Sequence, residues 1–286
     1  MDSLLIGQFI NGAIIGAIYG ILALAISLTF GLTGIVNFAL GSFMMVGAYC
    51  TWAMCALYNW PYPLAVAAAV ALTAVLGWVA DLLLFRLTRD HLVNGLLVSI
   101  GLVFIMEAAV QMIFTTTPQV LDPVVTGSVS VGAASVPTMR LVVLTLLCGC
   151  VGATYGMLNW TRVGRAIRAF AQDREGALVV GIPGARLQRL IFVGSTAIAG
   201  LGGALYASLY SIEPAMGAVY VLKAVEGAVL AGIGSTLGVL AAGIGLGTIE
   251  SVASLHLPLA FRDAYGLLAM ILILLFRPMG LFGARR

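Results

Sequence analysis

The sequence predicts an all-α, polytopic membrane protein with eight or nine transmembrane helices, one of them interrupted. Hydrophobic residues make up 62% of the 286 residues and charged residues only 9%, which is more apolar surface than a water-soluble fold of this length can bury. The 35 glycines suit a helical bundle in lipid, because small residues let helix backbones approach closely. Most basic residues fall in three short stretches between long apolar runs. We therefore expect a single membrane-spanning domain over residues 1–286.

Nine apolar runs are candidates for the spanning helices, because a helix of about 20 apolar residues crosses the hydrocarbon layer. They cover residues 5–30, 34–57, 64–85, 95–114, 141–160, 190–210, 218–233, 237–255 and 265–276. The seventh run is short and carries Lys223 and Glu226, which can pair along one helical turn. A short charged run of this kind can be partly re-entrant, which leaves the count at eight or nine.

The second run is the interrupted one. It begins GLTGIVNFALGS, in which Gly31, Gly34, Asn37, Gly41 and Ser42 break the apolar pattern. Unwound backbone at membrane depth is tolerated where protein or a watery cavity covers it, and transporter sites are often built from such helices. Asn37 and Ser42 are therefore candidate residues of a substrate pathway. A glycine-rich helix that packs tightly on a neighbour is an equally good interpretation.

Glycines four residues apart predict close helix contacts in three further places. Small residues at this spacing lie on one face of a helix, where they let a second backbone approach. The sets are Gly12, Gly16 and Gly20 in the first run, the pair Gly234 and Gly238, and the pair Gly243 and Gly247.

The basic stretches predict the orientation of the chain. They comprise Arg86 and Arg89, residues 162–189, and Arg277 with Arg285 and Arg286, directly after the third, fifth and ninth runs. Positive charge concentrates on the cytoplasmic side of a membrane. We expect a multi-pass protein of the cell inner membrane with the N-terminus outside and the C-terminus in the cytoplasm.

Residues 115–139 contain neither Lys nor Arg and carry three prolines, which predicts an external loop with extended structure.

The middle basic stretch, residues 162–189, predicts two short helices. In its first part, Arg165, Arg168, Gln172 and Glu175 follow a helical spacing, with apolar residues on another face. A short amphipathic helix at a membrane surface can transmit movement from a soluble partner. It can equally well rest on anionic lipid headgroups.

The second of these helices has its own start and stop signals. Asp173 can cap its N-terminus, and Glu175 suits the positive end of the helix dipole. Gly181 and Pro183 then supply a C-terminal stop.

Several chemistries are excluded by what the chain lacks. Its one lysine, Lys223, lies between Leu222 and Ala224, so no Gly-Lys-Ser/Thr phosphate loop is present. We expect no cofactor on this chain, and any ATP that drives it must bind a separate subunit. The two histidines, His91 and His256, are remote from each other and from the cysteines, so neither a catalytic set nor a metal site is expected. For the same reason we expect no enzyme activity. The basic stretches lack interleaved aromatics, so we expect no nucleic-acid partner either.

Glu107 lies near the middle of the fourth run, where an ionisable residue is costly and is a functional candidate. It can line a substrate pathway, or it can pair with a partner subunit. Glu250 and Asp81 lie nearer the ends of their runs, and we expect both carboxylates to reach interfacial water.

Five blocks of the sequence carry a resemblance to a known family. They are YGILALAISLTFGLTGIVNFALGSFMMVGAY at 19–49, GRAIRAFAQDREGALVVGI at 164–182, STAIAGLGGALYA at 195–207, PAMGAVYVLKAVEGAVLAGIGSTLG at 214–238 and LLFRPMGLFG at 274–283. Together they resemble the permease subunits of branched-chain amino-acid ABC importers, a family that also includes permeases for urea and short amides.

The resemblance implies a subunit that translocates branched-chain or related hydrophobic amino acids and is driven by separate ATPases. Its implied partners are a second homologous permease, two cytoplasmic ATPase subunits and a periplasmic solute-binding protein, besides the membrane lipid. Residues 164–182 would then contact the ATPase. The residues implied for this coupling are Arg165, Arg168, Asp173, Glu175 and Gly181.

One departure from the family pattern bears on the substrate. The family usually reads NFAHGE where this chain reads NFALGS, so Leu40 and Ser42 replace a histidine and a glutamate. The loss of two polar groups leaves room for a more apolar or aromatic carboxylate as substrate. Two other classes of function stay open: a secondary transporter driven by an ion gradient through Glu107, and a membrane scaffold that transports nothing.

Overall fold

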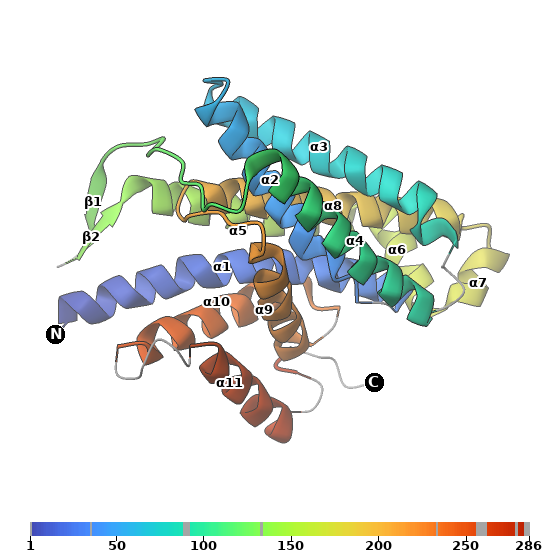
Figure 1. The fold of residues 1–286 in the computed structure, drawn as a ribbon. Helices are drawn as coiled ribbons and strands as arrows, with labels where there is room; N and C mark the ends of the chain where they lie inside the picture. Colours follow the sequence, from blue (N-terminus) through green and yellow to red (C-terminus); the bar gives the residue numbers. More distant parts are fainter. Residues whose placement is uncertain are drawn as a thin grey trace.

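A computed structural model of the chain describes residues 2–34, 36–87, 92–131, 134–232, 234–255, 262–277 and 280–282. The fold is all-α, as predicted, with one small hairpin (Figure 1). Its helices are α1 (Asp2–Thr33), α2 (Ala39–Ala56), α3 (Tyr62–Leu83), the 3₁₀ turn η1 (Phe85–Leu87), α4 (Leu92–Phe114), α5 (Thr138–Trp160), α6 (Arg162–Gln172), α7 (Arg174–Val179), α8 (Gly184–Ala207), α9 (Met216–Ala231), α10 (Thr236–Ala253) and α11 (Arg262–Phe276).

Each of the nine predicted apolar runs forms a helix, but the helices are not equally long. Within the described residues, seven are long and apolar enough to cross a membrane, namely α1, α2, α3, α4, α5, α8 and α10. The other two, α9 with 16 residues and α11 with 15, are shorter. The short, charged seventh run was predicted to be atypical, whereas the short length of α11 was not.

Helix α1 lies at the centre of the bundle, where it packs against α8, α9 and α10. Glycines form its contact with α10, as predicted. A Cβ on Gly12 would lie 2.7 Å from the carbonyl oxygen of Gly247, and one on Gly20 would lie 3.1 Å from the Cα of Leu240. Gly16 faces the backbone of Gly243 at even closer range. The two helix backbones therefore touch without intervening side chains.

The pair Gly234 and Gly238 does not form such a stripe, so that prediction was wrong. Gly234 lies in the turn before α10 with φ +99°, a conformation that suits glycine. Gly238 lies in the first turn of α10, where its N–H donates to the Ser235 hydroxyl at 3.1 Å. The spacing matched a packing stripe by coincidence, because the chain turns between the two glycines.

The unwound backbone predicted in the second run precedes α2 instead of interrupting it. Gly34 has φ +68°, and residues 36–38 are not helical. Gly41 and Ser42 lie inside the continuous helix α2, where Gly41 packs directly on the backbone of Gly217 in α9. The alternative interpretation, tight glycine packing, therefore holds for Gly41.

The two ends of the bundle differ in structure (Figure 1). At one end lie the N-terminus and an antiparallel hairpin of β1 (Ser128–Val131) and β2 (Ala134–Pro137), in which Val129 pairs with Val136. This hairpin confirms the extended structure predicted for residues 115–139, and β2 contacts α1. At the opposite end lie α6 and α7, which carry four of the arginines of the middle basic stretch.

Candidate functional site

The basic end of the bundle consists of two short helices that are capped by side chains. The Thr161 hydroxyl accepts a hydrogen bond from the N–H of Gly164 at 3.0 Å and caps α6. The Asp173 carboxylate accepts one from the N–H of Gly176, also at 3.0 Å, and caps α7. The N-cap predicted at Asp173 is therefore confirmed, and both helix starts are fixed by local hydrogen bonds.

The predicted stop signals also hold. Helix α7 ends at Val179, and Gly181 follows with φ +86° before Pro183 precedes α8. Glu175 lies in the first turn of α7. It does not share a helix face with Arg165, because α6 ends at Gln172 and Asp173 is extended. The single helical face predicted from Arg165 to Glu175 was therefore wrong.

An apolar cluster seats α6 and α7 on the bundle. Ile167 and Phe170 of α6 and Ala177 of α7 are buried against residues of three long helices. Those residues are Leu32 of α1, Leu158 of α5, and Leu187 and Ile191 of α8. A displacement of α6 or α7 must therefore move or deform the contacts with α1, α5 and α8, since packed cores yield little.

Arg168 adds polar contacts between α6 and the end of α5. Its guanidinium donates a hydrogen bond to the carbonyl oxygen of Leu158 and a longer one, at 3.4 Å, to the side chain of Asn159. A cation at the last carbonyls of a helix is favourable because it complements the helix dipole. Arg168, predicted to contact a partner, is thus engaged within the chain and fastens α6 to the end of α5.

The outer surface of α6 and α7 combines charge with exposed apolar groups. Arg165, Asp173 and Glu175 are exposed, and the guanidinium of Arg174 lies 5.9 Å from the centre of the Phe170 ring. Residues 178–180, which we call the apolar tip, are exposed beside them; Val179 is 87% exposed. The sequence analysis did not predict the apolar tip. The signal for it was a Leu-Val-Val run directly before a glycine turn.

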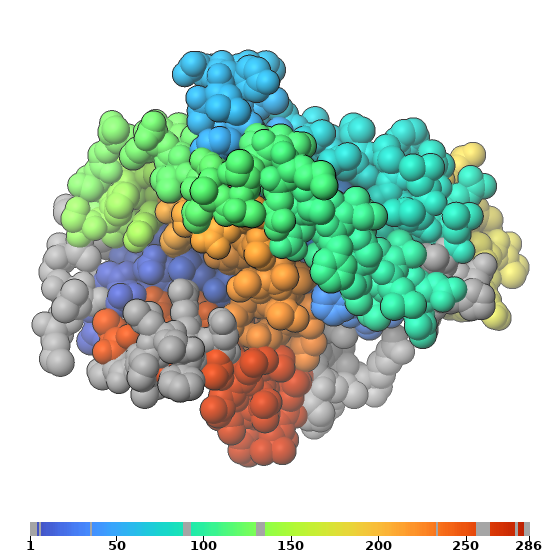
Figure 2. All heavy atoms as spheres, in the orientation of Figure 1, coloured from blue at the N-terminus to red at the C-terminus, as the bar shows by residue number. Residues whose placement is uncertain are grey.

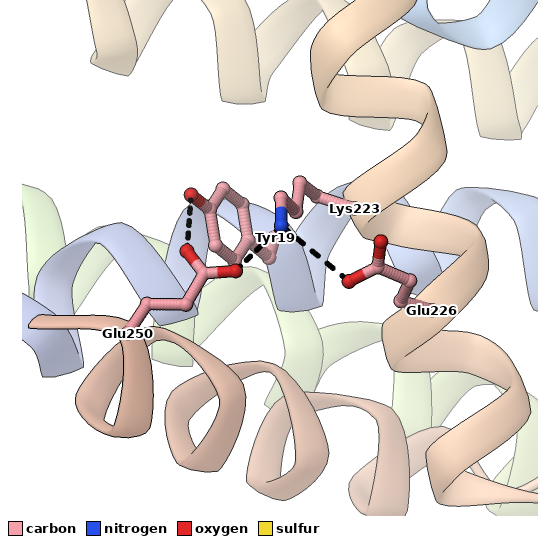
Figure 3. A network of polar contacts seen from close by, with 4 residues as sticks. All are labelled: Tyr19, Lys223, Glu226 and Glu250. Atoms are coloured by element: carbon pink, nitrogen blue, oxygen red, sulfur yellow. Dashed lines mark hydrogen bonds and ion pairs between the residues drawn. The ribbon is translucent and has the colours of Figure 1, made fainter. Parts of the chain in front are cut away.

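A second group of charges is buried inside the bundle (Figure 3). The Lys223 ammonium of α9 lies 2.6 Å from Oε1 of Glu250 in α10 and 3.6 Å from Oε2 of Glu226, one turn away. The Tyr19 hydroxyl of α1 donates to the other Glu250 oxygen at 3.2 Å. A Cβ on Gly266 of α11 would lie 2.5 Å from Glu250 Oε1. We call Tyr19, Lys223, Glu226 and Glu250 the buried charge cluster.

The structure corrects two expectations about buried charges and confirms a third. Glu250 was expected to reach interfacial water, yet it is 0% exposed because Lys223 and Tyr19 cover its carboxylate. Asp81 was expected to do the same, yet it is buried and accepts a hydrogen bond from Arg189 at 3.0 Å. The pairing of Lys223 with Glu226 was predicted correctly. A lysine at membrane depth requires a carboxylate partner, but its sequence position does not identify Glu250.

The three candidate pathway residues lie on two elements. Asn37 is buried before α2, where its side-chain oxygen accepts from the N–H of Ala39 at 3.1 Å. Ser42 is buried in the first turn of α2. Glu107 is half-buried on α4 and accepts a hydrogen bond from Gln111 of its own helix at 3.3 Å. Among the described residues, no hydrogen bond joins Glu107 to Asn37 or Ser42.

Comparisons with known proteins agree with this architecture. Residues 8–276 match the family model described as branched-chain amino acid transport system / permease component. The high-affinity branched-chain amino acid transport system permease protein LivH of Salmonella typhimurium is 30% identical over 96% of this chain and 94% of its own length, and LivH of Escherichia coli matches to the same extent. The corresponding permease protein BraD of Pseudomonas aeruginosa is 28% identical over 96% of this chain and 95% of its own. No solved structure matches the chain significantly.

Proposed function

This chain belongs to the family of branched-chain amino acid transport system permease components, and we propose that it forms one wall of the pathway in an ATP-driven importer of hydrophobic amino acids. It is a multi-pass membrane transporter subunit. The proposed substrates are leucine, isoleucine, valine or close relatives, because the similar LivH and BraD proteins are named for branched-chain amino acid transport. ATP would be bound and hydrolysed by separate chains.

The observation that carries this proposal is the construction of α6 and α7. Both helices are capped, seated on an apolar cluster, and present charged side chains beside the exposed apolar tip. Exposed apolar side chains that are rimmed by charge are typical of a protein-binding surface. We assign this surface to an ATPase subunit, with Arg165, Glu175 and the apolar tip as the contacting groups.

The seat explains how movement would pass from the ATPase to the pathway. Closure of an ATPase pair around ATP would shift α6 and α7, and the apolar cluster would pass the shift to α1, α5 and α8. ATP can favour one state of the permease only if the contacts at α6 and α7 differ between states. Asp173 and Arg168 then act as positioning residues, because they hold the two helices and do not themselves need to contact the partner.

The charge distribution supports the orientation, and membership of the permease family supports the remaining partners. The basic end would face the cytoplasm of a cell inner membrane, and the hairpin end with the N-terminus would face outward. A periplasmic solute-binding protein would deliver the substrate to the hairpin end. A second, related permease would complete the pathway, with Glu107, Asn37 and Ser42 as the candidate lining residues.

The test is reconstitution of the chain with its companion permease, ATPases and solute-binding protein in proteoliposomes. We expect leucine uptake that requires ATP inside the vesicles, and leucine should stimulate ATP hydrolysis more than urea or an aromatic carboxylate does. Uptake by this chain alone that an uncoupler abolishes would instead establish an ion-driven transporter.

A substitution in the apolar tip tests the docking surface directly. Val179→Glu should lower both ATPase co-purification and uptake at least tenfold, because it places a carboxylate in the apolar contact. Val129→Glu, on the exposed side of the hairpin at the opposite end, is the matched control and should leave ATPase co-purification unchanged. Equal co-purification by both variants would refute the assignment of the surface.

A further inference from the structure

An apolar groove runs between α3 and α4, with α2 as its floor. Its volume is about 820 Å³. Helix α4 packs on α2 and hardly touches α3, and Figure 2 shows α4 as a raised band across this face of the molecule. Its lining extends from Phe43 to Tyr58 on α2 and the turn after it, and includes apolar residues of α3 and α4.

The dimensions of the groove match a hydrocarbon chain. Its α2 side extends from Phe43 to Tyr58, about 22 Å at the helical rise of about 1.5 Å per residue. One leaflet of the bilayer contributes about half of the roughly 30 Å hydrocarbon core. An acyl chain of a lipid in one leaflet can therefore lie along the groove. Its rims, Leu83 on α3 and Ile113 on α4, are 60% and 70% exposed. The groove therefore opens sideways.

The apolar residues that line the groove are unsuited to bind the proposed amino-acid substrate. None of the residues that line the groove is charged. A zwitterion in such a place would leave an ammonium and a carboxylate without partners, and burying an unpaired charge is costly. A long apolar chain has no such groups, and it would regain the dispersion contacts that an empty groove lacks.

A positive charge lies at one end of the groove. Leu83 and Leu84 line the groove, and Arg86 follows two residues later in η1 with its side chain exposed. The nearby Asp81 does not cancel this charge, because its carboxylate is already paired with Arg189 at 3.0 Å. Basic side chains between helices at the end of a bundle attract anionic headgroups.

We propose that this groove binds an anionic phospholipid, with one acyl chain between α3 and α4 and the phosphate held by Arg86. The lipid fills the seam that the two helices leave open. Helix α4, which carries Glu107, then rests on a lipid instead of on α3. Its position relative to α3 depends on the presence of that lipid.

The experiment measures lipid retention, so it is independent of transport and of the proposed substrate. The complex containing the full-length chain is equilibrated with vesicles of equal parts phosphatidylglycerol and phosphatidylcholine, purified, and analysed by native mass spectrometry. We expect the wild-type chain to retain phosphatidylglycerol in at least fivefold excess over phosphatidylcholine. Arg86→Gln should remove this preference, whereas Arg140→Gln, at the start of α5, should keep it.

A second pair of variants tests the groove itself. Ala109→Trp fills the groove, and Ala108→Trp places the same side chain on α4 outside the lining. We expect the first to lower the total retained lipid at least threefold and the second to leave it unchanged. Equal retention by both would overturn the proposal. Crosslinking of Ile105→Cys to a second permease chain, with unchanged lipid content in all variants, would also overturn it and would mark the groove as a subunit interface.

Discussion

The basic end of the bundle and the buried charge cluster both combine acidic and basic side chains, but in opposite environments. At α6 and α7, the charged side chains are exposed and the apolar ones form the seat. In the cluster of Lys223, Glu226 and Glu250, the charges are buried, and they lie against one another and against Tyr19. Exposed charges such as Arg165 and Glu175 in the first region are therefore accessible to a partner, whereas the charges of the second region hold helices together.

The largest expected effect is at Glu250. Glu250→Ala would remove the closer of the two carboxylates that face the Lys223 ammonium, at 2.6 Å, and keep the Glu226 carboxylate at 3.6 Å. Removal of one member of a buried ion pair costs about 3–5 kcal/mol, because the remaining charge stays buried without adequate compensation. We expect a clear loss of thermal stability in detergent micelles, followed by circular dichroism.

Glu226→Gln is the control for that variant. It keeps the 2.6 Å pair of Lys223 with Glu250 and removes the weaker contact. We therefore expect a smaller fall in melting temperature than for Glu250→Ala, because the amide oxygen of Gln can still accept a hydrogen bond from the ammonium. If Glu226→Gln lowered the melting temperature as much as Glu250→Ala, the two carboxylates would contribute equally. The shorter distance of Glu250 to the ammonium would then not indicate a stronger interaction.

A smaller and more local effect is expected at Asp173. Asp173→Ala removes the side-chain cap of α7, and loss of an N-cap costs about 1 kcal/mol. Hydrogen exchange should quicken severalfold at the amides of residues 174–179, while the melting temperature of the bundle stays nearly constant. Asp173→Asn, which can still accept the hydrogen bond from Gly176, should restore slow exchange; faster exchange in both variants would argue against capping.

The smallest effect on stability is expected at Arg165. Its side chain is exposed, and surface substitutions away from special features usually change stability by less than about 0.5 kcal/mol. Arg165→Ala should therefore melt like the wild-type chain while it binds the ATPase subunits severalfold more weakly in a pull-down. A marked fall in melting temperature would place Arg165 among the structural arginines, with Arg168.

The features that were predictable from sequence are those set by neighbouring residues. The cap at Asp173, the stop at Gly181 and the glycine stripe of Gly12, Gly16 and Gly20 depend on local spacing, and the structure contains all of them. Gly234 and Gly238 have the same spacing as a true stripe, but a turn lies between them, which a spacing rule cannot detect.

The features that were not predictable depend on contacts between distant segments. The partner of Lys223 is 27 residues away, and Tyr19 lies 231 residues from Glu250. Similarly, the guanidinium of Arg168 folds back onto α5, whereas helical periodicity alone assigned it to the outer face. A hydrophobic pattern indicates which residues are buried. Which of them contact one another depends on how the helices cross.

Helix α1 is the longest helix in the part of the chain that the structure describes. It is one unbroken rod of 32 residues, about 48 Å at the rise of a helix. Leu32, near one tip, belongs to the seat of α6 and α7, and β2 touches the rod toward the other tip. If the proposed ATPase contact pushes on the arginine-rich end, a continuous helix of this length would carry the displacement to the hairpin without a hinge in between.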